Sequence, residues 1–197
     1  GYLGAVTTTY NTSSNVAGEW LQVALPVGIK LTSYTLQVGH QERAPGSWSI
    51  LGSPDGVTWT LVDTQSSFSS FVWYPAGNVL TFTVGSTTSY PYYRLVTSVK
   101  TNTGQPTWNY VQIVRWDLMG IKDDSTLRPY PQLLTAATTV ISGANYANGT
   151  YVCSESAGCA TQAYLAFDGN AGTSCDTASG TYSDVTGAYG YLGAVST

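Results

Sequence analysis

The chain has 197 residues, which is enough for one domain with a sizeable core. Only 9% of its residues are charged, against 43% hydrophobic and 13% aromatic, and the formal net charge is −4. Its seven Lys and Arg residues are scattered singly, so no basic cluster can neutralise phosphates, which excludes nucleic-acid binding. No apolar run reaches the roughly 18 residues that a membrane span needs, and we expect no membrane insertion.

Short alternating strands are expected along most of the chain. Apolar residues alternate with Thr, Ser or Gln, as in half-buried antiparallel strands, and the i, i+3, i+4 spacing of an amphipathic helix is missing. Ser53-Pro54-Asp55-Gly56 has the residues of a hairpin turn. Short strands at this spacing predict an all-β fold, a sandwich or a barrel. The expected strands are residues 20–25, 33–38, 47–51, 58–62, 79–84, 92–96 and 111–118.

The composition changes after the last of these strands. The stretch 122–137 contains Lys122-Asp123-Asp124-Ser125, Pro129 and Pro131, and such a charged, Pro-containing stretch is typical of a linker. We therefore divide the chain into residues 1–121, a linker at 122–137, and residues 138–197.

A six-residue word occurs twice in the chain. Gly1-Tyr2-Leu3-Gly4-Ala5-Val6 recurs as residues 190–195, and the pairs that follow, Thr7-Thr8 and Ser196-Thr197, differ by one hydroxyl-preserving change. Chance recurrence of six residues is very improbable. We call this six-residue sequence the recurring word. We interpret the chain as a stretch of a tandem array of repeats, in which the distance between the two copies of the word is the length of one repeat.

Several further words resemble, in order and spacing, the discoidin or coagulation-factor type C family. They are residues 18–23, 43–48, 52–56 with Trp59, 92–95 and 114–120. That family folds as a galactose-binding-like, jelly-roll β-sandwich, so the resemblance implies an antiparallel sandwich here. Repeats of this kind also resemble those in surface and fibre proteins of large algal viruses and protists.

The family's opening segment is found at the back of this chain. Residues 166–173 resemble its early loop and residues 141–146 resemble its entry. The resemblance therefore covers most of the chain in permuted order, with 138–197 first and 1–121 second. A sandwich in this order is completed either by the chain's own C-terminal segment or by that of a neighbouring copy.

In relatives, the early Asp-Gly-Asn loop wraps a calcium ion with oxygen ligands, which suit a hard cation. The resemblance implies a structural calcium ion held here by Asp168, Asn170, Thr173 and the carbonyl of Ala166. Arg115 stands where the family often has Glu, so its cation is an alternative that would replace the ion. The third alternative is a turn closed by hydrogen bonds alone.

Aromatic side chains in expected loops are candidates for glycan binding, as in carbohydrate-binding relatives. Trp73 and Trp108 are of this kind, with His40, Arg43 and Asn109 as polar neighbours that could bond sugar hydroxyls. The alternative is that these aromatic residues pack against a neighbouring repeat. The four tryptophans expected on strands, and hence in the core, are Trp20, Trp48, Trp59 and Trp116.

The cysteines and the glycosylation sequons indicate whether the protein is located inside or outside the cell. Cys153 and Cys159 could close a small loop disulfide and leave Cys175 for an intermolecular bond, and three buried thiols are the equal alternative. With one histidine in the chain and no knuckle spacing, we expect no zinc. The sequons at Asn11 and Asn148, together with the Thr/Ser-rich composition, favour a glycoprotein outside a cell or on the surface of a particle.

The sequence predicts no enzyme, because nucleophile and phosphate-loop motifs are missing and the few carboxylates belong to structural words. Two functions remain. The first is a structural repeat of an extracellular fibre or surface filament, assembled head-to-tail with neighbouring copies of itself through completion of the sandwich. The alternative is a lectin-like, glycan-binding adhesion module, with or without calcium, whose tandem copies gain avidity.

Overall fold

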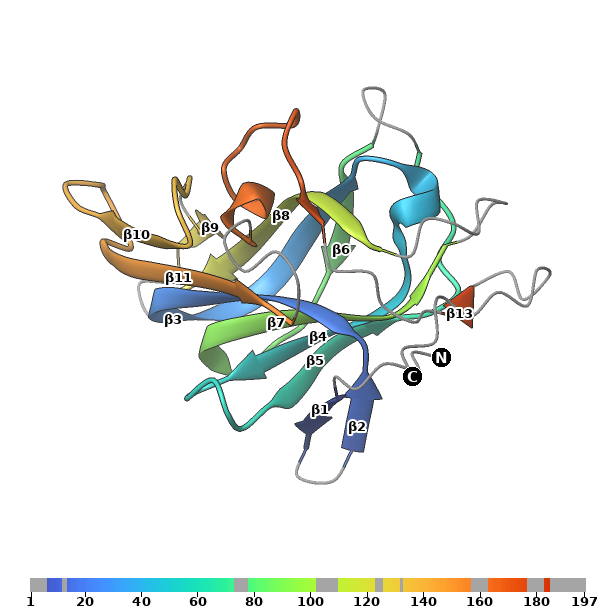
Figure 1. The fold of residues 1–197 in the computed structure, drawn as a ribbon. Coiled ribbons are helices and arrows are strands. Elements are labelled where there is room, and N and C mark those ends of the chain that lie inside the picture. The colour runs from blue at the N-terminus through green and yellow to red at the C-terminus, as the bar shows by residue number, and fades with distance from the viewer. Residues whose placement is uncertain are drawn as a thin grey trace.

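The structure is a computed structural model that describes residues 7–11, 14–72, 78–101, 110–122, 126–131, 133–156, 163–176 and 183–184. Nearly all of its regular structure is β (Figure 1). The exceptions among the described residues are two short 3-10 turns, η1 (Gln41–Arg43) and η2 (Ala163–Ala166). The predicted all-β sandwich is confirmed.

The first layer of the sandwich is an antiparallel sheet in the order β10-β11-β3-β7-β4-β5. The long strand β3 lies in its middle and pairs with β7 and with β11. The hairpin from β4 to β5 turns at Ser53–Gly56, as predicted, and Gly56 has the positive φ of 76° that favours glycine. The bounds are β10 (Thr138–Ile141), β11 (Gly149–Glu155), β3 (Glu19–Val38), β7 (Ser89–Lys100), β4 (Pro45–Ser53) and β5 (Thr60–Gln65).

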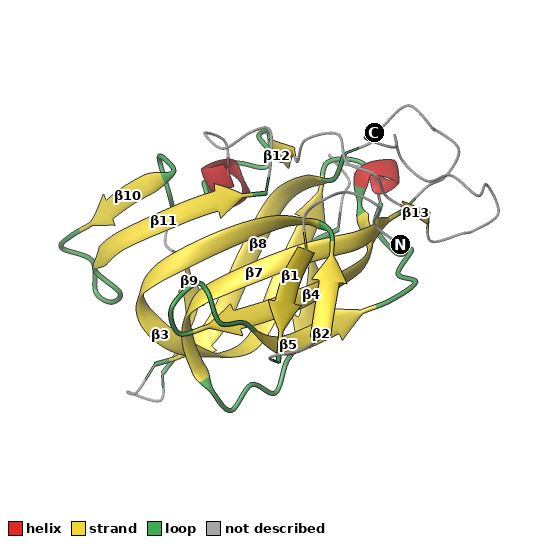
Figure 2. Ribbon diagram, turned by 60° about the horizontal axis from the view of Figure 1, so that its bottom comes forward, coloured by secondary structure: helices red, strands yellow, loops and turns green. Residues whose placement is uncertain are grey.

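The second layer is built on the last part of β3. From Lys30 to Val38 that strand pairs with β8, and from Ser33 to Leu36 it also pairs with β6. On its other side β8 pairs with β9 and with β12. Figures 1 and 2 show β3 curving through both layers. The bounds are β6 (Leu80–Thr83), β8 (Gln112–Ile121), β9 (Leu127–Tyr130) and β12 (Cys175–Asp176); β13 (Ser183–Asp184) pairs in parallel with the end of β7.

The hydrophobic core lies between the two layers. Period-two alternation puts Trp116 and Leu118 of β8 inside, whereas Arg115 and Asp117, which alternate with them, face outward. The centre also holds a polar chain, in which the Trp48 indole donates to the Tyr34 hydroxyl at 2.9 Å and that hydroxyl donates to Asp63 at 2.7 Å. The largest fully buried side chains are Trp48, Trp116, Tyr34, Tyr93, Tyr130 and Tyr151.

All seven predicted strands are strands, but two of them are one element. Residues 20–25 and 33–38 both belong to β3, and the register with β7 shifts between Ala24 and Ile29 instead of ending the strand. Of the four tryptophans expected in the core, Trp48 and Trp116 are in the main cluster. Trp59 is buried in a second cluster, and Trp20 packs against it while partly exposed.

The C-terminal segment completes the sandwich of its own chain. Residues 152–155 of β11 pair with β3, and Cys175 pairs with Ile113 of β8. Tyr151, Cys153 and Phe167 are buried in the same core as the residues of β3 and β8. In this structure of a single chain, strands of that chain therefore complete both layers.

The predicted linker at 122–137 is wrong for most of its described part. Leu127–Tyr130 forms β9 and pairs with β8 from Leu118 to Ile121. Tyr130 is 1% exposed and Leu134 is also 1% exposed, so this segment is anchored in the core. In the sequence Pro129 favours a linker, but proline is also compatible with an edge strand, where a missing N–H is tolerated. β9 is such a strand at the edge of the second layer.

A hairpin precedes the sandwich and packs on the outside of the first layer. It consists of β1 (Thr7–Tyr10) and β2 (Ser14–Ala17), which pair with each other as a two-stranded sheet, and Tyr10 of β1 also forms an isolated parallel bridge with Trp59. Gly18 joins the hairpin to β3, and a Cβ there would lie 2.1 Å from the carbonyl oxygen of Thr97. Only glycine therefore allows the chain to run so close to β7.

Candidate functional site

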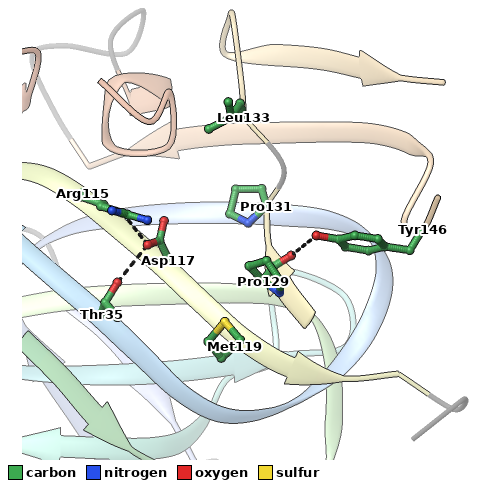
Figure 3. A pocket seen from close by; sticks show the side chains of 8 residues that line it. All are labelled: Thr35, Arg115, Asp117, Met119, Pro129, Pro131, Leu133 and Tyr146. Atoms are coloured by element: carbon green, nitrogen blue, oxygen red, sulfur yellow. Dashed lines mark hydrogen bonds and ion pairs between the residues drawn. The ribbon is translucent and has the colours of Figure 1, made fainter. Parts of the chain in front are cut away.

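A groove of about 510 Å³ lies on the outer face of the second layer, and we call it the β8–β9 groove (Figure 3). Its floor follows from strand alternation, because Arg115, Asp117 and Met119 are the outward residues of β8. Thr35 stands opposite Asp117 in the register of β3 with β8, and Pro129 stands opposite Met119 on β9. Pro131, Leu133 and Tyr146 complete the lining.

The charged groups of the groove form one compact, neutral unit. Arg115 Nε donates to Asp117 Oδ2 at 2.5 Å, and Thr35 Oγ1 donates to the same oxygen at 3.0 Å. The Arg115 side chain is 48% exposed, so the ion pair itself contributes no more than about 1 kcal/mol to stability. Its remaining N–H groups and the second carboxylate oxygen offer donors and acceptors side by side at zero net charge.

Tyr146 forms one end of the groove and ties a loop to β9. Its hydroxyl donates to the carbonyl of Pro129 at 3.0 Å, and its ring meets Tyr130 edge-to-face at 5.5 Å. The guanidinium of Arg128 lies 4.9 Å from the centre of the same ring. Figure 3 shows this hydroxyl directed at Pro129, on the side of the groove away from Arg115. The groove thus has fixed walls that combine apolar and polar groups, as small-molecule sites do.

The predicted calcium loop is closed by its own hydrogen bonds. Asp168 Oδ1 accepts from the N–H of Asn170 at 2.8 Å, and Asp168 Oδ2 accepts from Thr173 Oγ1 at 2.7 Å. Asn170 in turn accepts from Thr173 through its carbonyl and from Gly172 through its side chain. Both oxygens of the Asp168 carboxylate therefore accept hydrogen bonds within the loop, as in the alternative of a turn closed by hydrogen bonds alone.

Arg115 forms its ion pair with Asp117. This contact does not support the alternative in which the Arg115 guanidinium replaces the calcium ion of the Asp168 loop. No group of three His, Cys, Asp or Glu side chains that could hold a metal is found in the described part of the chain. Calcium binding through Ala166, Asp168, Asn170 and Thr173 stays a prediction.

The predicted glycan residues fall partly at one end of the sandwich. His40 is the N-cap of η1, its Nδ1 accepts from the N–H of Glu42 at 3.3 Å, and its side chain is 12% exposed. Burial lowers the pKa of His40, which keeps the ring neutral at physiological pH. Arg43 stacks on Tyr110 at 4.8 Å. The other members, Trp73, Trp108 and Asn109, lie outside the described residues.

This end also holds the Asp168 loop. A cavity of about 160 Å³ is lined by Gly39 beside the η1 turn and by Thr173 of the loop, with Gln112 between them. Gln112 Nε2 donates to Ser174 Oγ at 3.2 Å. The structure therefore brings the two predicted sites into one neighbourhood, although the glycan set remains a prediction.

Cys153 lies in the core, and burial raises the pKa of its thiol well above its usual range. Its predicted partner, Cys159, lies outside the described residues, so their disulfide stays a prediction. Cys175 is buried and its Sγ donates to Glu155 Oε2 at 3.2 Å, which does not favour an intermolecular bond.

The two sequon asparagines are both exposed. Asn148 closes its loop by exchanging hydrogen bonds of 2.9 Å with the backbone of Ala144. Asn11 has a positive φ of 47° at the tip of the β1–β2 hairpin and faces β5.

Arg94 is a structural residue of the outer face whose role the sequence does not reveal. Its guanidinium lies between the rings of Trp20 and Trp59, 4.1 Å from each centre. It donates twice to Gln22 Oε1, at 3.0 and 2.7 Å, and once to Thr8 Oγ1 of the hairpin at 3.0 Å. Desolvation lowers the pKa of Arg94 to about 10. Because its partners come from three separate segments, no local motif could have indicated them.

No family model matches this sequence, and no curated protein matches it at a significant level. The resemblance to the discoidin family therefore rests on the residues quoted for it. No helix of the described residues is long and apolar enough to cross a membrane.

Proposed function

We propose that this chain is a non-catalytic structural repeat of an extracellular fibre or surface filament. The observation that carries the proposal is the place of the recurring word in the sequence, relative to the strands that the structure describes. The word at residues 1–6 leads directly into the hairpin β1–β2, which covers the outer face of the first layer. Its second copy at 190–195 follows a segment whose strands have already closed the sandwich. In the sequence, the first residues of a second unit therefore follow directly after the segment that completes the first unit.

Closure within one chain favours a covalent head-to-tail array over one made by strands donated between chains. The unit supplies its own β11 and β12, so no neighbour is needed to complete either layer. The neighbouring copies of itself that we propose as partners would then be joined by the continuous polypeptide, and each would fold as a bead.

The experiment is a two-unit polypeptide made by joining a second copy of the chain at the recurring word, so that the word occurs once at the junction. Electron microscopy should show two equal globules at a constant spacing, and small-angle scattering should give an elongated particle. A single enlarged globule, or a second copy that stays unfolded, would contradict the array.

A second candidate function is glycan binding, and the β8–β9 groove favours it. A neutral ligand with many hydroxyls suits the Arg115–Asp117 pair, which offers donors and acceptors without net charge. A glycan array, run with calcium and with chelator, tests this function. Binding should be lost in Arg115→Ala and kept in His40→Ala if the groove is the site, and the reverse result would place it at the η1 end. No binding in either condition would count against both.

A further inference from the structure

Strand β10 is the terminal strand of the first layer (Figure 2). The N–H of Cys153 donates to the carbonyl of Ala137 at 2.8 Å, and antiparallel hydrogen-bonded pairs recur at every second residue. Thr139 and Ile141 therefore direct their backbone groups toward β11. Thr138 and Val140 direct theirs away from the sheet, where no described strand follows.

Apart from its short length of four residues, this edge shows, among the described residues, none of the features by which native proteins usually prevent edge pairing. The register of β10 with β11 is continuous and has no bulge, and β10 contains no proline. Residues 133–154 contain no charged side chain at all. Val140 is 70% exposed and Val152, on the same outward face of the next strand, is 40% exposed. An uncharged, β-branched, regular edge is a template for another strand.

The opposite edge of the same sheet is protected. At β5, the N–H of Asn11 donates to the carbonyl of Trp59 at 2.9 Å, and Asn11 Oδ1 accepts from the N–H of Leu61 at 3.2 Å. The hairpin tip thus covers the backbone groups at the start of this edge. Farther along, β5 carries the acidic Asp63. One edge of the first layer is closed and the other is open, which restricts where a strand can be added.

We propose that β10 binds the β10 strand of a second copy of this chain, antiparallel and across a two-fold axis. Antiparallel pairing of identical strands is self-complementary, as a two-fold interface requires. With Thr138 opposite Val140 of the second copy, both outward residues of each strand exchange backbone bonds, about four in all. The uncharged segment lets two copies of net charge −4 approach at this edge without local repulsion. The two sheets become one continuous sheet.

This contact goes beyond the tandem array and does not depend on it, because a single unit contains the whole edge. In an array it would join neighbouring chains side by side. A single unit that dimerises would support the contact even if the two-unit polypeptide showed no array.

Sedimentation equilibrium over a hundredfold concentration range tests the contact. We expect a monomer–dimer equilibrium for the chain and a dissociation constant about a hundredfold higher for Val140→Lys, because a charge at an edge opposes pairing. Val140 is largely exposed in the monomer, so the variant should unfold at the same temperature as the original at low concentration. Val57→Lys makes the same change at a side chain that is 79% exposed in the β4–β5 turn, and it should dimerise like the original.

Amide exchange followed by NMR locates the contact. The N–H groups of Thr138 and Val140 should exchange rapidly at low concentration and become protected as dimer forms. A chain that stays monomeric throughout, or a dimer that survives Val140→Lys unchanged, overturns the proposal. Protection that rises elsewhere and not at these two amides also overturns it.

Discussion

The partly buried guanidinium of Arg94 should hold the N-terminal hairpin on the sandwich. We consider Arg94→Met, which keeps the length and the apolar stem of the side chain but removes its charge and its donors. The substitution removes two ring contacts, to Trp20 and Trp59, and three hydrogen bonds, to Gln22 and Thr8.

The expected loss follows from these contacts. A partly desolvated cation–π contact contributes about 1 kcal/mol, and a hydrogen bond to a charged group contributes about 1.5 kcal/mol or more. Part of this sum is offset because burying the cation is itself costly, as the pKa of Arg94, lowered to about 10, indicates. We expect a net loss of about 2–3 kcal/mol in the free energy of unfolding, or roughly 6–8 °C in Tm for a chain of this size.

Urea unfolding followed by tryptophan fluorescence and circular dichroism measures this loss. Hydrogen exchange should show the amides of β1 and β2 opening more readily than those of β4 and β7, because Thr8 loses its bond to the sheet. Arg115→Met is the matched control, since it removes one exposed ion pair and should cost less than about 1 kcal/mol. If Arg94→Met costs no more than this control, or leaves hairpin exchange unchanged, the assigned role of Arg94 is wrong.

Three further predictions concern the backbone, the pH dependence and the calcium loop. Gly18→Ala puts a Cβ 2.1 Å from a backbone oxygen and should destabilise the chain by about 2 kcal/mol or more, whereas Gly85→Ala, with nothing within 4 Å, should be nearly neutral in thermal unfolding. Burial raises the pKa of Tyr34 and of Tyr93, so the unfolded chain loses these protons first and stability should fall as pH rises above about 10; a flat alkaline profile would refute this. Asp168→Ala should lower Tm through the loss of two hydrogen bonds; a Tm of the original chain that rises with calcium would support the predicted metal site, and a Tm that is the same in calcium and in excess chelator would support a turn closed by hydrogen bonds alone.

The strands could be predicted because alternation is a local signal. Trp116 and Leu118 alternate with Arg115 and Asp117, and that pattern fixes both the strand and the face of each side chain. The turn at Asp55 is equally local, because its carboxylate accepts from the N–H groups two and three residues on, which also lowers the pKa of Asp55 to about 2. Features that depend only on residues a few positions apart in the sequence can be predicted without knowing the fold.

What could not be predicted depends on contacts between distant segments. The joining of two predicted strands into β3 depends on neighbours that pair with it on both layers. The composition around Pro129 indicates a linker. The stretch becomes an edge strand because it pairs with β8, and that pairing cannot be recognised from the local sequence. The β8–β9 groove brings together Thr35, Asp117 and Tyr146, which lie far apart in the sequence.

The proposed covalent array requires that strands of the same chain close its sandwich. The direct measurement is the thermal unfolding of Val140→Lys, whose edge should not dimerise, over a hundredfold range of protein concentration. If β11 and β12 come from the same chain, the unfolding temperature should not change with concentration, and the amides of β11 should stay protected at the lowest concentration. An unfolding temperature that falls on dilution, with early loss of protection in β11, would show that the strands come from another copy.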